Sequence, residues 1–269
     1  MRLLFIGDVI GRAGREAVSS HLPALKEELA LDFIILNGEN AAHGFGLTRR
    51  LADEFFALGV DCITTGNHWL DQREILSFIG EDDRVLRPLN LPKGTPGRGV
   101  NLFQAKNGEQ VLVIAPIGRV FMEPQDDPFA AVARELELCP LGVGADAIVV
   151  DFHAEASSEK MAMGHFCDGR VSLVVGSHSH VPTADAQILP GGSGYQSDAG
   201  ACADYDSVIG MDKNEPLQRF LTRMPGGRMT PAEGPGTLCA VFVETARGGM
   251  AQCIEPVRLG GRLKSTRPY

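Results

Sequence analysis

Short apolar runs of strand length alternate with helix-like segments through the first half of the chain, and the end of the chain is patterned differently. The apolar runs predict buried strands because each is too short for a helix and most end in glycine or polar residues. They lie at Leu3–Gly7, Phe33–Asn37, Cys62–Thr65, Val111–Ala115, Ala147–Asp151 and Leu173–Val175. Helices are predicted at Arg15–Leu29, Arg49–Leu58, Gln72–Ile79 and Asp127–Leu138. Pro23 is expected to kink or restart the first helix.

Two antiparallel hairpins are predicted from turn residues between strand-like segments. Asn107-Gly108 favours a tight turn with positive φ, and Arg247-Gly248-Gly249 separates the second pair of segments. The paired segments are Asn101–Ala105 with Gln110–Ile114, and Leu238–Thr245 with Met250–Val257. Alternating strands and helices followed by an antiparallel end predict an α/β domain with a mixed sheet or two packed sheets.

The chain shows no internal repeat and no segment that resembles a domain linker. Pro190–Gly194 and Met224–Gly236 are loop-like, and the basic segment Arg262–Tyr269 is expected to be poorly ordered. We therefore expect one domain that spans residues 1–269.

Composition is typical of an ordinary globular protein. Hydrophobic residues make up 44% of the 269 residues and charged residues 22%, which is enough for a sizeable core. No apolar stretch approaches the ~20 residues that cross a bilayer, and the start MRLLFIGDVIGR reads as a first strand, not as a signal peptide. The six cysteines form no CxxC pair, which fits free thiols in a reducing compartment. We expect a cytoplasmic protein with no membrane partner.

The net charge of −9 narrows the range of partners. A chain this acidic has no broad basic surface for duplex nucleic acid. Bound cations can reverse the local field at a site, so a small nucleotide or phosphodiester substrate remains compatible with the charge. A homo-oligomer is also compatible with the sequence.

Metal-binding residue types follow five of the predicted strands, usually after a glycine. They are Asp8, Glu39, Asn40, Asn67, His153, His178 and His180, with His68 next to Asn67. The carboxyl ends of strands in α/β sheets gather at one edge and form the ligand crevice. These side chains are therefore expected to meet there.

The residue types also fit one another chemically. Carboxylates and neutral imidazoles bind divalent ions such as manganese, iron and zinc, and amide oxygens are weaker ligands. His178 and His180 are two apart on an extended segment, so they point to opposite sides and can each reach a different ion. A carboxylate such as Glu39 can bridge two ions roughly 3.5–4 Å apart, and such a pair can activate a hydroxide for in-line attack on phosphorus.

Each residue alone also has a structural explanation. A lone histidine at a strand end is usually a loop residue, Asn67 can belong to a turn, and Asp8 can cap the following helix. Caps and turns do not require histidine at three separate strand ends, so the metal interpretation is favoured for the set. The role of Asp71 stays open, either orienting His68 or starting a helix. Four other residues could each line the site or serve the surrounding structure: His43, His165, Asp198 and Asp206.

This succession of motifs resembles the calcineurin-like metallophosphoesterases. The nearer likeness is to their bacterial YmdB-like branch of phosphodiesterases, through NGENAAHGFGLT (37–48), TTGNHWLDQREI (64–75) and SDAGACADYDSVIGMDKNEP (197–216). The resemblance runs from the first strand to the final hairpin. It implies a four-layer α/β/β/α sandwich with the metal centre at the sheet edges.

The resemblance also implies roles for single residues. One ion would be held by Asp8, Glu39, Asn40 and His180, and the other by Glu39, Asn67, His153 and His178. His68 would donate a proton or orient the substrate. Two divalent ions per chain, iron or manganese, would be expected, with activity on phosphodiesters including 2′,3′-cyclic nucleotides.

The chain departs from the wider superfamily without losing a ligand. Ile10 stands where the superfamily has histidine, and Glu39 replaces its bridging aspartate, but both are normal for the branch. His43, Trp69-Leu70 and Ala201-Cys202-Ala203 differ from the residues usual in the branch. These changes concern the surroundings of the ligands and therefore bear on substrate preference.

Two alternative functions remain open on the sequence. A phosphomonoesterase could use the same centre, but its more highly charged substrate needs extra cationic contacts. The nearby arginines fit helices better: Arg12, Arg49, Arg50 and Arg73. A regulator that binds metal or nucleotide without turnover is the other alternative. His68 speaks against it, because metal binding alone needs no proton donor.

Overall fold

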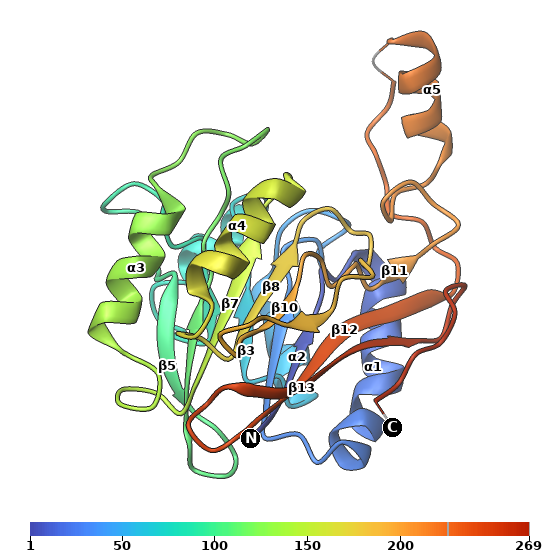
Figure 1. The fold of residues 1–269 in the computed structure, drawn as a ribbon. Helices are drawn as coiled ribbons and strands as arrows, with labels where there is room; N and C mark the ends of the chain where they lie inside the picture. The colour runs from blue at the N-terminus through green and yellow to red at the C-terminus, as the bar shows by residue number, and fades with distance from the viewer. Residues whose placement is uncertain (225, 269) are drawn as a thin grey trace.

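The computed structural model describes residues 1–224 and 226–268, and two β-sheets form its centre (Figure 1). The first sheet has the strand order β11-β12-β1-β2-β3-β4, with β13 beside β12. Its strands are β1 (Arg2–Ile6), β2 (Phe33–Asn37), β3 (Cys62–Thr64), β4 (Val85–Leu86), β11 (Ala203–Asp204), β12 (Gly236–Thr245) and β13 (Ala251–Leu259). Strands β1 to β4 are parallel, whereas β12 is antiparallel to both β1 and β13. The predicted C-terminal hairpin is confirmed.

The second sheet has the order β5-β6-β7-β8-β10-β9. Its strands are β5 (Val100–Gln104), β6 (Gln110–Ile114), β7 (Ala147–His153), β8 (Leu173–Ser177), β9 (Gln187–Ile188) and β10 (Gly194–Gln196). Strands β6, β7, β8 and β10 are parallel, and β5 and β9 pair antiparallel at the two edges. Both sheets are therefore mixed, as the sequence pattern predicts.

The helices agree with the predictions only in part. They are α1 (Gly11–Glu28), α2 (Arg49–Ala57), α3 (Pro128–Leu138), α4 (Ser157–Cys167), α5 (Asn214–Thr222) and the 3₁₀ helix η1 (Arg73–Ser77). The prediction of a restart at Pro23 is wrong, because α1 continues through it while Leu22 and Leu25 stay buried on either side. The segment Gln72–Ile79, predicted as a helix, forms only the short η1. None of the helices in the described part of the chain combines the length and apolar character needed to cross a membrane.

Alternating side chains divide the apolar core into layers. Leu3 and Phe5 on β1 belong to the cluster between the two sheets. Leu4 and Ile6, on the opposite face of the same strand, pack in the cluster that includes α1 and α2. Ile148 on β7 belongs to a third cluster with residues of α3 and α4. The helices thus cover the outer faces, and the expected four-layer α/β/β/α sandwich is confirmed (Figure 1).

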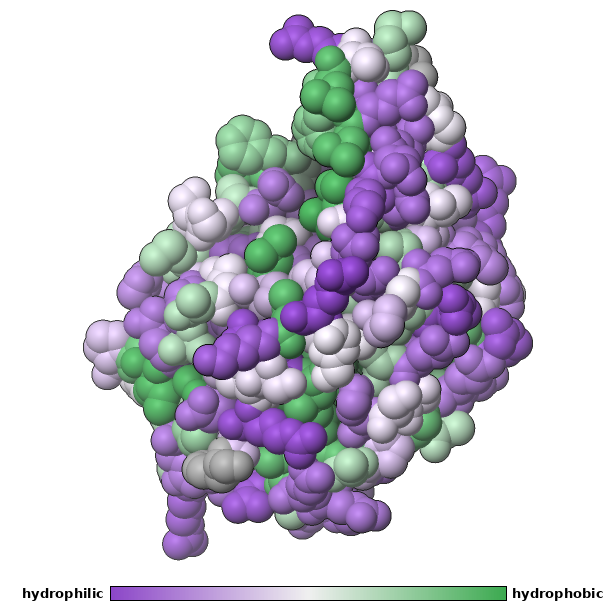
Figure 2. Space-filling view, turned by 90° about the vertical axis from the view of Figure 1, so that its right-hand side faces the viewer, coloured by the Kyte–Doolittle hydropathy of each residue, from purple (hydrophilic) through white to green (hydrophobic). Residues whose placement is uncertain are grey.

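Helix α5 stands out from the body of the molecule as an arm (Figure 1). Figure 2 shows hydrophobic residues gathered along this arm. Leu217, Phe220 and Leu221 are exposed there, with Phe220 and Leu221 each 82% accessible. The arm therefore contributes little to the core, and the site is built on the sheets.

The C-terminal segment is attached to the body. Arg258 and Thr266 exchange two backbone hydrogen bonds of 2.9 Å, and Arg267 forms an ion pair of 3.1 Å with Glu28. The expected poor order of this segment is therefore wrong for residues 262–268. Tyr269, and Pro225 within the loop-like segment 224–236, lie outside the described residues.

Candidate metal centre

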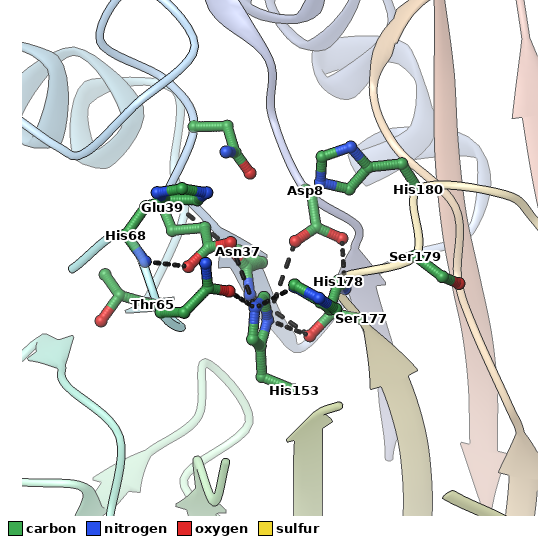
Figure 3. Close-up of polar contacts among 12 residues, drawn as sticks. Asp8, Asn37, Glu39, Thr65, His68, His153, Ser177, His178, Ser179 and His180 are labelled. Carbon is green, nitrogen blue, oxygen red and sulfur yellow. Dashed lines mark hydrogen bonds and ion pairs between the residues drawn. The ribbon is translucent and has the colours of Figure 1, made fainter. Parts of the chain in front are cut away.

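The predicted ligands meet where the carboxyl ends of both sheets come together (Figure 3). Asp8 follows β1, the pair Glu39-Asn40 follows β2, and Asn67 follows β3, all in the first sheet. His153 ends β7, and His178 and His180 follow β8, in the second sheet. The site is therefore shared by the two sheets and lies at the edge that the sequence predicts.

Two groups of metal-binding side chains form within the described residues, and they share one member. Glu39, His153 and His178 make one group, and Asp8, Glu39 and His180 make the other. In each group the ligand atoms lie within 4.8 Å of one another. Glu39 is thus the carboxylate common to both, in the position expected of a bridge.

Several donor atoms crowd around one ring nitrogen in the first group. His153 Nε2 lies 2.8 Å from Asn67 Oδ1, 3.1 Å from His178 Nδ1 and 3.1 Å from Glu39 Oε1. A single N–H on that nitrogen can satisfy only one of these three atoms well. A cation bound among them would satisfy all of them at once.

In the second group, hydrogen bonds to the backbone fix the directions of the side chains. Asp8 Oδ2 accepts the His178 backbone N–H at 3.2 Å. Asn40, a predicted ligand outside the two groups, donates from Nδ2 to the Gly44 carbonyl at 2.9 Å. His180 Nδ1 lies 2.9 Å from the Ile209 carbonyl, which fixes the N–H on that nitrogen and leaves the Nε2 lone pair as a ligand.

Buried oxygens without a hydrogen-bond partner support the fit to metal. Asp8 Oδ1, Glu39 Oε1 and Asn40 Oδ1 are all buried and accept no hydrogen bond of good geometry, although Glu39 Oε1 forms an ion pair of 3.1 Å with His153 Nε2. A buried polar atom left unsatisfied costs roughly 1–3 kcal/mol and calls for an explanation. Three such oxygens at one place, all from predicted ligands, match the donor set of a divalent cation.

The pKa values of the clustered side chains depend on one another. Burial acts to raise the pKa of Glu39, but the charge of His153 outweighs it and lowers that pKa to about 2. Burial acts to lower the pKa of His153, but Glu39 and Asp8 outweigh it and raise that pKa to about 9. Burial raises the pKa of Asp8 to about 6, and burial lowers the pKa of His178 to about 3. The imidazolium of His153 thus supplies positive charge where carboxylates cluster.

Outer contacts hold His153 in one orientation. His153 Nδ1 lies 2.9 Å from Ser177 Oγ, which donates to Asp151 at 2.6 Å. Thr64 and Asn37 donate to the other oxygen of Asp151. Such contacts fix the tautomer and ring direction of a ligating histidine. This network is absent from the sequence-based predictions, although a carboxylate inside the apolar run AIVVDF signals it.

A buried ion pair supports the histidine segment after β8. The expected extended conformation of this segment is wrong, because β8 ends at Ser177 and both His178 and His180 have positive φ, at 93° and 64°, which is uncommon for residues other than glycine. Asp198 accepts hydrogen bonds from Ser179 N at 3.1 Å and Ser179 Oγ at 2.7 Å. Lys160 Nζ on α4 lies 2.7 Å from the same Asp198 oxygen. Asp198 therefore positions this segment, and Lys160 was not found from the sequence.

His68 is oriented beside the ligands and belongs to neither group. Its backbone N–H donates to Glu39 Oε2 at 3.0 Å, and its Nδ1 lies 2.8 Å from Asp71 Oδ2. The open alternative for Asp71 is therefore decided in favour of orienting His68. Asn67, His68 and His178 line a cavity of about 420 Å³ in front of the cluster.

The remaining candidates lie outside the cluster. His43 is exposed and lines a separate cavity of about 1090 Å³ that shares Asp71 with the first one. His165 is exposed on α4. Asp206 pairs with Lys213 at 2.8 Å, so it serves the base of the arm.

The two-sheet fold and this cluster define a protein of the metallophosphoesterase class. The chain belongs to the YmdB-like family, because the family model described as YmdB-like protein matches residues 4–257. The predicted family is thereby confirmed. The predicted phosphoric ester hydrolase agrees with the names of relatives, which are a phosphodiesterase and a putative phosphatase/phosphodiesterase.

Individual relatives agree with this membership. The Bacillus subtilis (strain 168) protein named 2′,3′-cyclic-nucleotide 2′-phosphodiesterase is 47% identical over 244 residues, covering 91% of each chain. A crystal structure of a hypothetical protein from Thermus thermophilus matches with a TM-score of 0.90 at 43% identity, over 97% of this chain and 100% of that one. A novel phosphatase from Mycoplasma pneumoniae matches with a TM-score of 0.88 at 32% identity, over 97% and 93%.

Proposed function

We propose that the chain is a dinuclear metal-dependent phosphodiesterase that hydrolyses 2′,3′-cyclic nucleotides. The observation that carries this proposal is the position of Glu39 in both metal-binding groups. The name of the 47% identical Bacillus protein supports the substrate class.

The proposed ligands divide between two ions, iron or manganese. Asp8, Asn40 and His180 would hold one, Asn67, His153 and His178 the other, and Glu39 would bridge them. Two ions held there would polarise the phosphoryl oxygens and lower the pKa of the attacking water. The chain itself fixes the ligand directions through Ser177, Asp151 and Asp198.

His68 is proposed to protonate the leaving oxygen. Hydrolysis forms one phosphorus–oxygen bond from water and breaks the bond to a ribose oxygen, which needs a proton as it leaves. Asp71 holds Nδ1 of His68, so Nε2 is the nitrogen left to carry that proton. The cavity in front of the cluster gives His68 access to a bound ester.

The proposal is tested with metal-loaded and chelated protein on four substrates. These are a 2′,3′-cyclic nucleotide, a nucleoside monophosphate, bis-(p-nitrophenyl) phosphate and p-nitrophenyl phosphate. We expect metal-dependent hydrolysis of the two diesters and much slower hydrolysis of the monoesters. Faster monoester hydrolysis would favour a phosphomonoesterase, and no turnover by loaded protein would favour a metal-binding regulator.

A further inference from the structure

The loop after β6 exposes one aromatic side chain beside the metal centre. Phe121 is 87% exposed and has a φ of +62°. A bulky residue in the left-handed region is an outlier, and backbone strain of this kind clusters at functional sites. Exposing a large apolar ring to water is also unfavourable. The backbone conformation belongs to the turn from Arg119 to Met122, in which Met122 N donates to the Arg119 carbonyl at 3.5 Å. The turn does not account for the exposure of the ring.

The stem of this loop is bonded directly to a proposed ligand. Gly118 N donates to the His153 carbonyl at 2.9 Å, and His153 N donates to the Pro116 carbonyl at 3.0 Å. Asn90 is buried and holds both backbone groups of Ile117, at 2.8 and 2.9 Å. The loop therefore leaves the site in a fixed direction.

A carboxylate from α4 holds the backbone of the next residues in the loop. Glu159, only 8% exposed, accepts the backbone N–H groups of Arg119 at 3.1 Å and Val120 at 3.2 Å. A Cβ at Gly118 would lie 2.6 Å from the same carboxylate, so the loop packs closely on it. The backbone is therefore held by buried side chains up to Val120, directly before Phe121.

Phe121 is part of the wall of the cavity in front of the metal-binding groups. Phe121 and Met122 line the cavity of about 420 Å³ together with Asn67, His68 and His178. Ligand cavities for small molecules measure roughly 300–1,000 Å³, so this one can hold a mononucleotide. A phosphate at the metal ligands would leave the rest of the molecule to extend along the lining residues.

We propose that Phe121 is the surface on which the nucleobase of the substrate stacks. This inference rests on the proposed function and names the part of the substrate that the metal centre does not hold. Stacking on an aromatic ring tolerates all bases because every base has a π face. The site therefore takes 2′,3′-cyclic nucleotides with little preference among bases, and it discriminates against cyclic phosphates that carry no base.

The test compares two substrates and three variants of the metal-loaded protein. The substrates are adenosine 2′,3′-cyclic phosphate and methyl riboside 2′,3′-cyclic phosphate, which lacks the base. The variants are Phe121→Ala, Phe121→Trp and Phe220→Ala, the last a control because Phe220 is 82% exposed on the distant arm. Metal content and melting temperature are measured for each variant.

Phe121→Ala is expected to raise KM for the adenosine substrate roughly ten- to hundredfold with little change in kcat, as loss of a stacking platform does. The same variant should leave the methyl riboside unaffected, and Phe121→Trp and Phe220→Ala should keep the wild-type KM. Equal loss on both substrates, or loss on neither, would overturn the stacking role. If the wild type hydrolyses neither substrate, the proposed function fails. Calorimetric binding of adenosine 3′-monophosphate to Phe121→Ala and wild type then still decides whether Phe121 stacks.

Discussion

Asp8 and Glu39 bring two carboxyl groups with no solvent exposure into one small site. Burying a charge is costly unless it is paired. His153 lies next to both carboxylates. Burial acts to lower its pKa, but Glu39 and Asp8 outweigh burial and raise that pKa to about 9. Because a histidine ligand must be neutral, binding of a cation has to displace that proton. A proton on His153 and a metal ion held by the same carboxylates would therefore compete.

Replacing Glu39 by glutamine should damage both proposed ion sites at once. The neutral amide keeps the shape of the side chain but cannot offset two adjacent cations. We expect a loss of activity of about two orders of magnitude or more, as for removal of a central electrostatic element, together with a lower metal content. Elemental analysis and turnover of a phosphodiester measure both.

A control for this variant is Asp61→Asn, which removes a half-buried carboxylate that accepts the Ile34 N–H away from the site. It should keep its metal and most of its activity. Near-normal turnover of Glu39→Gln would show that Glu39 is not the bridge.

Replacing His68 by alanine should separate metal binding from proton transfer. Because His68 lies outside both metal-binding groups, the variant should keep its ions. General acid catalysis typically contributes ~10²–10⁴-fold, and we expect a loss in that range with alkoxide leaving groups. Esters of nitrophenol should lose less, because nitrophenolate leaves without a proton.

The rates of His68→Ala on a cyclic nucleotide and on bis-(p-nitrophenyl) phosphate measure this difference, with metal content determined alongside. Asp71→Asn should show a milder form of the same pattern, since it weakens the contact that orients the ring. Loss of an ion from His68→Ala would make His68 a ligand. Equal slowing on both esters would leave it a role in positioning the phosphate only.

At the scale of elements, the strand ends that carry the proposed ligands could be predicted from the sequence. Helix α4, which supports the loops of the site, could not. The proposed ligands are polar residues directly after apolar runs, so their meeting at one edge follows from parallel strands. Helix α4 was missed because its buried face carries Glu159 and Lys160, residues that hydrophobic patterning assigns to solvent. Their partners, the Arg119 backbone and Asp198, are 40 and 38 residues away, and no local pattern indicates such pairs.

Helix α5 and the exposed Phe121 were also not predicted from the sequence. Helix α5 was missed although Pro216 is in its first turn, where a missing N–H is tolerated. Phe121 carries no signal in the sequence, because an isolated phenylalanine in a loop is normally explained by burial. Its exposure depends on the contacts of Glu159 and Asn90, which only the fold brings together.

Lys160→Met should destabilise the protein strongly through the element that holds the histidines. The Lys160 and Asp198 side chains are 2% and 1% exposed, and removing one partner leaves the other charge buried. Breaking a buried pair in this way costs roughly 3–5 kcal/mol in the free energy of unfolding. Chemical denaturation of the metal-free protein measures the loss.

The matched control is Lys213→Met, since Lys213 and Asp206 form a pair that is 48% and 46% exposed. Exposed pairs are screened by water and contribute little, so this variant should unfold close to the wild type. Equal stability of the two variants would mean that the Lys160 contact does not support the segment 178–180.

At the scale of the whole molecule, the site joins the two halves of the sandwich. Asp8 and Glu39 come from loops of the first sheet, and His153 and His178 come from the second sheet (Figure 3). Asn67 also belongs to the first sheet, in the loop after β3. None of these five residues belongs to the described apolar cluster between the sheets. A cation held by ligands from both sheets would therefore act as a cross-link between them.

Metal binding should accordingly stabilise the folded chain, and the gain should grow with pH. A ligand that binds only the folded state, at a free concentration of 100 times its Kd, adds about 2.7 kcal/mol to the free energy of unfolding. In the metal-free chain the pKa of His153 is raised from 6.5 to about 9. A group with a raised pKa contributes stability below its unfolded pKa and loses it as the pH rises through the folded pKa. The metal-free chain should thus lose stability between pH 6.5 and about 9.

As the pH rises over this interval, the affinity of the folded chain for metal should increase, because fewer protons compete for His153. The difference in melting temperature between manganese-loaded and chelated protein should therefore widen from pH 6.5 to about 9. Scanning calorimetry at several pH values measures it, with Glu39→Gln as the control that should show little difference at any pH. A wild-type difference that stays constant across this range would contradict the competition between proton and metal at His153. Identical melting with and without manganese would contradict the cross-link itself.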